Sequence, residues 1–261
     1  MEYRSRPTLN LSPPGLMERP TPHRRRGVYI LPNLFTTAAL FAGFYAVTAT
    51  LNQRFELAAI AIFVAMALDG LDGRVARLTN TQSAFGAEYD SMADMISFGA
   101  APALVMYAWA LMGLGKFGWV AAFVHTAGAA LRLARFNTQI ATADRRYFQG
   151  LPSPSAAAIL AGLIWFCEDH GISGESVRYL GLGLATATGL LMVSNFRYYS
   201  FKDIDLRGRV PFVWAIVTML LFAFVFTNPP LMLFLIFSSY AVSGPVLTLL
   251  RRRRMRSERR A

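Results

Sequence analysis

The chain has 261 residues, of which 54% are hydrophobic and 16% are charged. Soluble domains average about 25% charged residues, and here the apolar residues fall in long runs, which excludes an ordinary soluble domain. The single cysteine, Cys167, excludes an internal disulfide and a cysteine metal cluster. The sequence therefore predicts an all-α, polytopic membrane protein with no second globular domain.

Residues 1–27 precede the first apolar run and hold five of the 13 prolines together with a basic cluster at Arg24, Arg25 and Arg26. This composition predicts a disordered basic arm in the cytosol rather than a cleaved signal peptide. The expected organisation is this arm, a transmembrane domain over residues 28–250, and a basic cytosolic tail over residues 251–261.

Eight apolar segments follow the arm, and a transmembrane helix needs roughly 20 residues. The predicted spans are residues 30–50, 57–79, 92–113, 117–137, 153–168, 177–195, 210–227 and 229–250. The seventh and eighth segments meet at Thr227–Pro230, where two prolines predict a tight helical turn.

The distribution of basic residues predicts the orientation of these spans. With both termini in the cytosol, all but three of the 26 lysines and arginines lie on the cytosolic side; the exceptions are Arg54, Lys116 and Arg178. An even number of spans puts both ends on one side, so span count and charge agree. Most of the net charge of +11 is then explained as a topology signal that also attracts anionic lipid headgroups, and nucleic acid is not expected as a partner.

Four aspartates lie beside the second and third segments. Asp69 and Asp72 are three residues apart, and Asp90 and Asp94 are four apart, so each pair shares one helix face. The pairs sit at the cytosolic ends of consecutive antiparallel helices, and a short turn near residues 79–86 brings them together. The sequence therefore predicts four carboxylates around one point.

Carboxylates this close repel one another and cannot all remain ionised without cations. Oxygen ligands alone suit Mg²⁺ or Mn²⁺, and a pair of divalent ions held by carboxylates is suited to phosphoryl transfer. Gly73 and Gly86 leave room for a ligand near the backbone, and Arg77 is placed to meet a diphosphate. The alternative is a structural ion-pair network in which Arg74 and Arg77 neutralise the aspartates.

The residues Asp69, Asp72, Gly73, Ala76, Arg77, Gly86, Asp90 and Asp94 form the pattern D-x-x-D-G-x-x-A-R-x8-G-x3-D-x3-D. This pattern resembles the signature of the CDP-alcohol phosphatidyltransferases. The resemblance implies a six-helix core, usually a homodimer, two divalent cations in each active site, and transfer of a phosphoryl group from a CDP-linked alcohol with release of CMP.

Carried over by position, the resemblance implies that Asp69 and Asp90 bridge both metals, Asp72 binds one, and Asp94 binds the other and acts as general base. The implied nucleotide contacts are Asn33, Thr36, Gly73, Ala76, Arg77, Ser83 and Gly86.

Residues 31–47 and 132–157 are similar to the membrane-integral CDP-diacylglycerol–serine O-phosphatidyltransferases, which implies L-serine as acceptor. The carboxylate of serine needs a cation, and arginine suits it. Arg135 is the first candidate for this contact, followed by Arg132 and Asn137. The two C-terminal spans are then additions to the core, for dimerisation or stability. The expected location is a bacterial cell or inner membrane, with the active site facing the cytoplasm.

Two other readings stay open at this point. The same chemistry could use glycerol 3-phosphate, inositol or an amino alcohol as acceptor. A cation transporter would place its aspartates at the bilayer midplane rather than at one membrane face.

Three further residues have structural expectations. His125 lies in an apolar segment and is expected to form interhelical hydrogen bonds, and Tyr198 and Tyr199 are expected to be interfacial aromatics.

Overall fold

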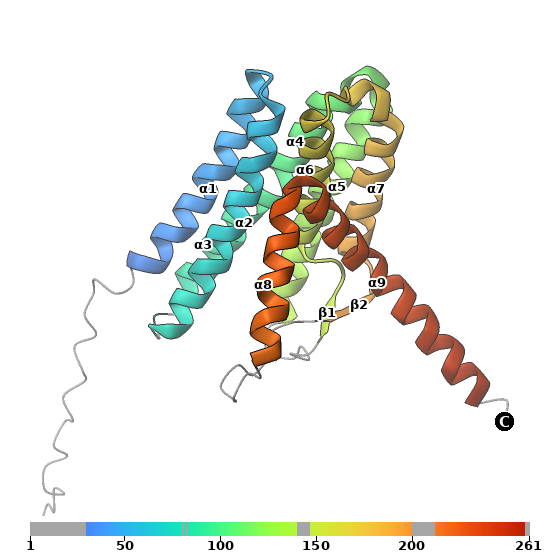
Figure 1. Ribbon diagram of the computed structural model, residues 1–261. Helices are drawn as coiled ribbons and strands as arrows, with labels where there is room; N and C mark the ends of the chain where they lie inside the picture. Colours follow the sequence, from blue (N-terminus) through green and yellow to red (C-terminus); the bar gives the residue numbers. More distant parts are fainter. Residues whose placement is uncertain (1–29, 80, 82, 140–146, 200–211, 259–261) are drawn as a thin grey trace, which may run out of the picture.

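A computed structural model describes residues 30–79, 81, 83–139, 147–199 and 212–258. The described chain is almost entirely helical (Figure 1). The eight predicted segments correspond to its long helices, so the all-α prediction is confirmed. The predicted cytosolic arm, residues 1–27, lies outside the described residues.

Helices α1 (Ile30–Leu51) and α2 (Phe55–Leu78) form the first antiparallel hairpin. Their contact is built from small residues, among which Ala46, Ala58 and Ala65 are fully buried. Small side chains allow two helix backbones to approach closely, as in many membrane proteins. The hairpin therefore holds the C-terminal end of α2 close to the N-terminal end of α1.

The third segment is one long helix with irregular turns. It comprises α3 (Ala84–Asp94), the π-helical η2 (Met95–Ala100), α4 (Ala101–Met106), the π-helical η3 (Tyr107–Leu111) and the 3₁₀ turn η4 (Met112–Leu114). Pro102 has no backbone N–H, so it cannot bond the carbonyl of Phe98. His125 Nε2 lies 3.2 Å from that carbonyl oxygen instead.

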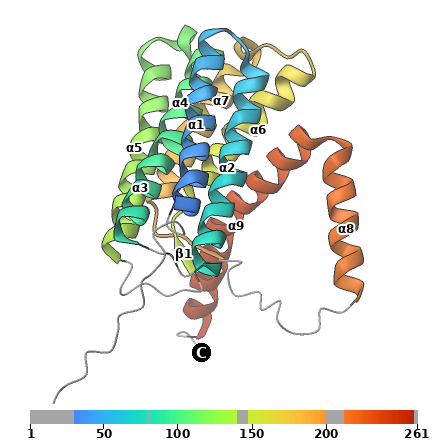
Figure 2. The same cartoon turned by 90° about the vertical axis from the view of Figure 1, so that its left-hand side faces the viewer.

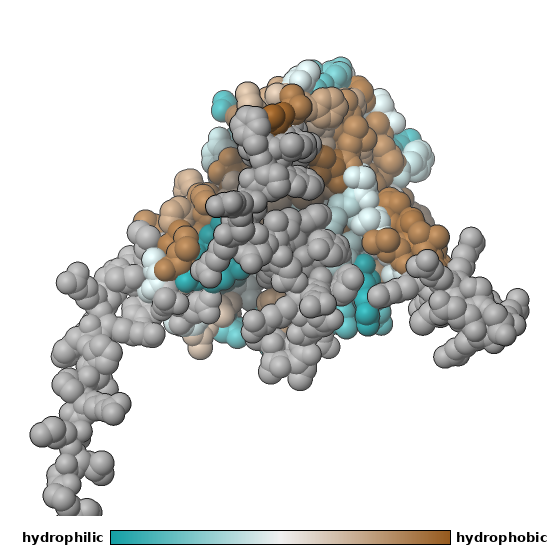
Figure 3. All heavy atoms as spheres, turned by 60° about the horizontal axis from the view of Figure 1, so that its bottom comes forward, coloured by the Kyte–Doolittle hydropathy of each residue, from teal (hydrophilic) through white to brown (hydrophobic). Residues whose placement is uncertain are grey.

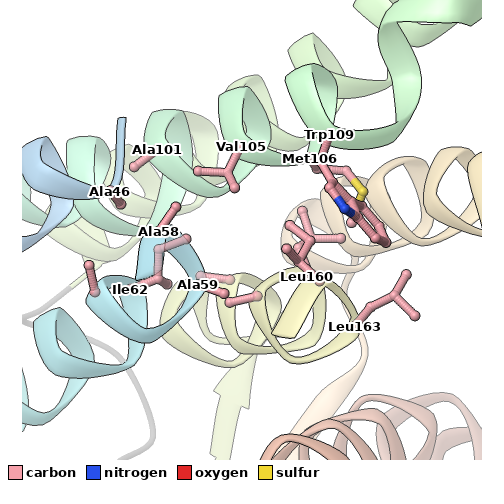
Figure 4. Packing of buried hydrophobic residues seen from close by; sticks show 14 of the residues in the cluster. Ala46, Ala58, Ala59, Ile62, Ala101, Val105, Met106, Trp109, Leu160 and Leu163 are labelled. Atoms are coloured by element: carbon pink, nitrogen blue, oxygen red, sulfur yellow. The ribbon is translucent and has the colours of Figure 1, made fainter. Parts of the chain in front are cut away.

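Helices α5 (Lys116–Gln139), α6 (Ser153–Asp169) and α7 (Arg178–Val193), with the 3₁₀ turn η5 (Gly174–Val177) before α7, complete the bundle. Besides Phe98, His125 contacts Thr188 Oγ1 through Nδ1 at 2.8 Å, so it joins α5 to η2 and α7. The predicted interhelical role of His125 is confirmed. Figure 4 shows the packed centre, where α2, α4, η3 and α6 bring together Ile62, Val105, Met106 and Leu160.

A short antiparallel ribbon pairs β1 (Tyr147–Gln149) with β2 (Arg197–Tyr199) at the end of the bundle where α2 stops and α3 starts. Tyr198 was predicted to be an interfacial aromatic, and this prediction is wrong: the side chain is fully buried. The error arises because the local sequence does not reveal that a later helix covers it.

The chain ends in α8 (Phe212–Thr227) and α9 (Pro229–Glu258). Asn228 forms the predicted turn, where its Oδ1 accepts from the N–H of Leu231 at 3.2 Å. Figure 2 shows α8 standing away from the bundle, whereas the first half of α9 leans against it. The two added spans therefore have different environments.

Five helical stretches in the described part of the chain are long and apolar enough to cross a membrane. They are residues 33–51, 84–114, 116–138, 174–193 and 229–250. Helix α2 carries the charged residues around Asp69 and Asp72, and α6 and α8 have only 17 and 16 residues. Helix α2 is therefore too charged, and α6 and α8 are too short, to count among these five membrane-spanning stretches, although all three were predicted as spans.

Candidate active site

The predicted carboxylate cluster forms at the end of the α2–α3 hairpin. Asp69 and Asp72 lie in the last turns of α2, and Asp90 lies in the second half of α3. One carboxylate oxygen from each of these three residues lies within 4.8 Å of the other two. The i,i+3 spacing on α2 and the antiparallel return of α3 are sufficient to produce this arrangement.

Asp94, one turn after Asp90, faces the same cluster. Its carboxyl group lies within hydrogen-bonding reach of Asp69 and interacts electrostatically with Asp90. The guanidinium of Arg132 on α5 interacts electrostatically with both Asp69 and Asp94. The structure therefore brings together all four predicted aspartates, with one half-buried arginine beside them.

The environment of the carboxylates fits a bound cation. Oδ1 of Asp90 is buried and has no hydrogen-bond partner among the described residues, although buried polar atoms are normally satisfied. Asp72 is buried, and its Oδ2 accepts a 2.7 Å hydrogen bond from Thr36 Oγ1, which fixes the carboxylate. Convergent carboxylate oxygens with a free lone pair and an outer hydrogen-bond donor are what a hard divalent ion requires.

The predicted nucleotide contacts gather around this cluster from three helices. Gly73, Ala76 and Arg77 continue α2 beyond the aspartates, and Nε of Arg77 donates to the carbonyl of Gly73 at 2.9 Å. Gly73 is exposed, and a methyl group added there would have nothing within 4 Å. The side of α2 next to the carboxylates therefore has open space at Gly73, and nucleotide binding there stays a prediction.

Ser83 and Gly86 have a local structural task. Oγ of Ser83 accepts from the N–H of Gly86 at 3.0 Å and caps α3. A Cβ at Gly86 would lie 3.4 Å from Oδ1 of Asn33, so the side chain of Asn33 on α1 reaches the start of α3. Asn33 therefore lies beside the start of α3 and Thr36 bonds Asp72 on α2, while their contact with a nucleotide stays a prediction.

The three residues predicted to contact serine have different surroundings. Arg132 donates from Nη1 to Oγ of Ser153 at 2.9 Å, while its Nε is buried without a partner among the described residues. Arg135 donates to Oδ1 of Asn195 at 3.2 Å. Asn137 exchanges hydrogen bonds with Ser91 on α3, at 3.2 and 3.3 Å. Of the two arginines, Arg132 is the one that interacts electrostatically with the aspartates within the described part of the chain.

Sequence reasoning missed Ser153 and Ser91, which hold Arg132 and Asn137 in place. Both serines are neighbours of assigned features, since Ser91 follows Asp90 and Ser153 starts α6. A helical-face analysis of α3 would not have flagged Ser91, because it lies one residue off the face of the aspartates, and Ser153 lies on another helix. Their roles depend on how α5 is rotated against α3 and α6.

Figure 3 brings the lower end of Figure 1 forward. Apolar side chains cover much of the flank of the bundle, and hydrophilic side chains gather between them near this end. The aspartates lie on the same side of the molecule, in the last turns of α2 and in α3.

Comparison with known proteins gives a match consistent with this geometry. The sequence profile of the CDP-alcohol phosphatidyltransferases matches residues 29–227. This chain belongs to the CDP-alcohol phosphatidyltransferase family. The matched region contains all eight positions of the aspartate motif and stops just before α9.

Several known relatives share the name CDP-diacylglycerol–serine O-phosphatidyltransferase. The Helicobacter pylori (strain J99) protein is 35% identical over 217 residues, which cover 83% of this chain and 90% of the relative. The Mycobacterium leprae protein is 31% identical over 88% of this chain and 78% of the relative. The Methanocaldococcus jannaschii protein is 36% identical over 54% of this chain and 63% of the relative.

Proposed function

We propose that this protein transfers the phosphatidyl group of CDP-diacylglycerol to the hydroxyl of L-serine, giving phosphatidylserine and CMP. The observation that carries the proposal is the convergence of Asp69, Asp72, Asp90 and Asp94 beside Arg132 in a member of this family. The names of the relatives from H. pylori and M. leprae support serine as the acceptor.

The four carboxylates would hold two divalent cations, Mg²⁺ or Mn²⁺, which when bound would neutralise the diphosphate and the departing CMP phosphate. The donor set fits, because Asp90 offers an unpaired oxygen and Thr36 holds the carboxylate of Asp72. The exposed face at Gly73 leaves room for the diphosphate, and Arg77 is near enough to reach it after leaving the carbonyl of Gly73.

The reaction needs one proton transfer and one exchange of bonds at phosphorus. Asp94 would accept the proton of the serine hydroxyl as its oxygen bonds to the phosphorus that carries diacylglycerol. The bond from that phosphorus to the bridging oxygen then breaks, and CMP leaves with the electron pair. Asp94 suits the role of base because it lies outside the set of three aspartates whose oxygens converge within 4.8 Å, and the neighbouring Arg132 could hold the acceptor beside it.

The acceptor carboxylate is best placed on Arg132 rather than Arg135. Arg132 lies beside Asp94 and has a buried Nε without a described partner, whereas Arg135 is engaged with Asn195. A guanidinium recognises a carboxylate through two parallel hydrogen bonds. Asn137, bound to Ser91, would shape the pocket from the other side.

The predicted orientation completes the proposal. The aspartate end of the bundle would face the cytoplasm, with the basic termini against anionic headgroups and the acyl chains of CDP-diacylglycerol in the inner leaflet. A homodimer is also expected from the family resemblance. Crosslinking in intact membranes and labelling of single introduced cysteines at either end would test these two points.

An acceptor panel tests the function directly. The purified full chain is given CDP-diacylglycerol, Mn²⁺ and one acceptor at a time: L-serine, glycerol 3-phosphate, inositol or ethanolamine. The proposal predicts CMP release with L-serine and at most a small rate with the others. A faster reaction with another acceptor would replace serine, and cation-driven flux without CMP release would favour a transporter.

A further inference from the structure

Helix α9 lies beyond the region matched by the family profile, yet it is built into the bundle. The profile ends at residue 227, and α9 begins at Pro229. The backbone of α9 reaches α6 at Gly162, where an added Cβ would lie 3.0 Å from Cα of Phe234. A contact this close needs glycine on α6, so α9 is fitted to the core rather than loosely attached to it.

A second contact joins α9 to the β-ribbon. The buried hydroxyl of Tyr198 in β2 donates to the carbonyl of Ala241 at 3.0 Å, and burial raises the pKa of Tyr198 to about 12, so the group stays a neutral donor. A Cβ at Gly244 would overlap the ring of Tyr198. Tyr198 therefore fixes both the depth and the rotation of this part of α9.

That rotation directs Tyr240 toward the active site. The ring of Tyr240 lies 5.5 Å from the ring of Tyr198, and Tyr240 interacts electrostatically with the guanidinium of Arg132. Arg132 in turn acts on Asp94 and Asp69. Tyr240 also packs against the apolar cluster that contains Ala129, one turn before Arg132, and Ala156, one turn after Ser153. Arg132 therefore lies within electrostatic reach of the carboxylates and of a phenol from α9.

We propose that α9 forms one wall of the acceptor pocket and that Tyr240 is a positioning residue for Arg132. The inference rests on the proposed function, in which Arg132 receives the carboxylate of the acceptor. Ser153 holds one arm of the guanidinium through Nη1, and Tyr240 interacts with the same group electrostatically. The guanidinium is then held in place for an anionic acceptor before the acceptor arrives.

This arrangement gives the C-terminal helices a function different from the dimerisation or stability expected from the sequence. The family profile ends at residue 227, so the wall formed by α9 lies outside the region by which the family is recognised.

The test is a comparison of Michaelis constants in the full chain. CMP release is measured against L-serine at saturating CDP-diacylglycerol, and then against CDP-diacylglycerol at saturating serine. Tyr240→Phe is expected to raise the KM for serine roughly 3- to 10-fold, the effect of losing one polar contact to a charged group. The kcat and the KM for CDP-diacylglycerol should stay within about twofold of wild type, the range of a remote substitution.

A matched control removes the hydroxyl from another tyrosine that lies beside an arginine. Tyr179 has Cζ of Arg178 5.2 Å from its ring centre, at the opposite end of the bundle. Tyr179→Phe should leave both KM values unchanged. If it raised the KM for serine as much as Tyr240→Phe does, the effect would be general and the proposal would be wrong.

A second variant displaces Tyr240 by moving the helix that carries it. Gly244→Ala pushes α9 away from Tyr198 and should raise the KM for serine, whereas Gly183→Ala, in a helix with open space around it, should not. The kcat at saturating acceptor shows in the same experiment that each variant is folded. An unchanged KM for serine in both Tyr240→Phe and Gly244→Ala would overturn the proposal.

Different results would contradict serine as the acceptor and the role of α9. If wild type releases no CMP with serine but does so with another acceptor, serine is wrong, and the same KM comparison is made with that acceptor. If wild type uses serine and neither α9 variant alters its KM, serine stands and the role of α9 is wrong.

Discussion

At the end of the bundle where α6 stops, carboxylates lie beside donors. Glu168 accepts a 2.7 Å hydrogen bond from Nε1 of Trp109, Asp169 lies 3.7 Å from His170, and Glu175 lies 3.5 Å from Arg178. At the other end, Asp69, Asp72, Asp90 and Asp94 face one another, and none forms a salt bridge within the described residues.

The difference separates a structural use of carboxylates from a catalytic one. Solvated pairs such as Asp169–His170 contribute little to stability and need no other partner. Four convergent carboxylates repel one another and can all stay ionised only if positive charge joins them, which one half-buried arginine supplies incompletely. The aspartate end is therefore the end at which we propose that cations and a diphosphate bind.

The largest expected effect comes from the proposed base. Asp94→Asn keeps the shape of the side chain but removes its ability to accept a proton, so kcat should fall roughly 10²- to 10⁴-fold. Asp169→Asn is the control, because it makes the same chemical change at the opposite end and should leave kcat unchanged. CMP release is measured for both, and an active Asp94→Asn would refute the assignment of the base.

An intermediate effect is expected from the residue that orients a carboxylate. Thr36→Val removes the 2.7 Å hydrogen bond to Asp72 and should weaken Mn²⁺ activation about 10- to 100-fold, as for other outer partners of metal ligands. Thr50→Val removes a buried hydroxyl that bonds only locally to the carbonyl of Ala46, and serves as the control. Equal Mn²⁺ dependence in the two variants would show that Thr36 does not act on the metal site.

The smallest effect should come from the other end of the bundle. Trp109→Phe removes the donor to Glu168 and part of a buried ring, and is expected to cost about 1 to 3 kcal/mol of stability with no change in kcat. Thermal unfolding in detergent measures the first quantity, and CMP release at saturating substrate measures the second. A large loss of kcat in this variant would show that the two ends are not functionally distinct.

Sequence reasoning located the helices because hydrophobic length is a direct record of the bilayer thickness. It placed the start of the third apolar span at residue 92, whereas the helix that carries this span begins at Ala84. The first turns of α3 line a polar site, so they carry Ser91, Asp90 and Glu88 instead of an apolar run. The π-helical turn after Asp94 was also not predicted, since it depends on Pro102 and on packing with His125.

The site was predictable where spacing along one helix determines geometry, as for Asp69 and Asp72. It was not predictable where the rotation of a helix about its axis determines which side chain faces the site. Arg132 and Arg135 are three residues apart, and only packing against α3 and α6 shows that Arg132 lies beside the aspartates. Tyr240 lies far along the chain from every motif, and its approach depends on the burial of Tyr198.

The most direct test of the account is metal binding itself, measured without relying on catalysis. Mn²⁺ is titrated into the full chain with CDP-diacylglycerol present, and the free ion is followed by electron paramagnetic resonance. The account predicts two bound ions per chain in wild type and in Asp169→Asn, with binding weakened at least about tenfold in Asp90→Asn, which loses a charged ligand. Equal Mn²⁺ binding by Asp90→Asn and wild type would contradict the assignment of the aspartate cluster as the metal centre.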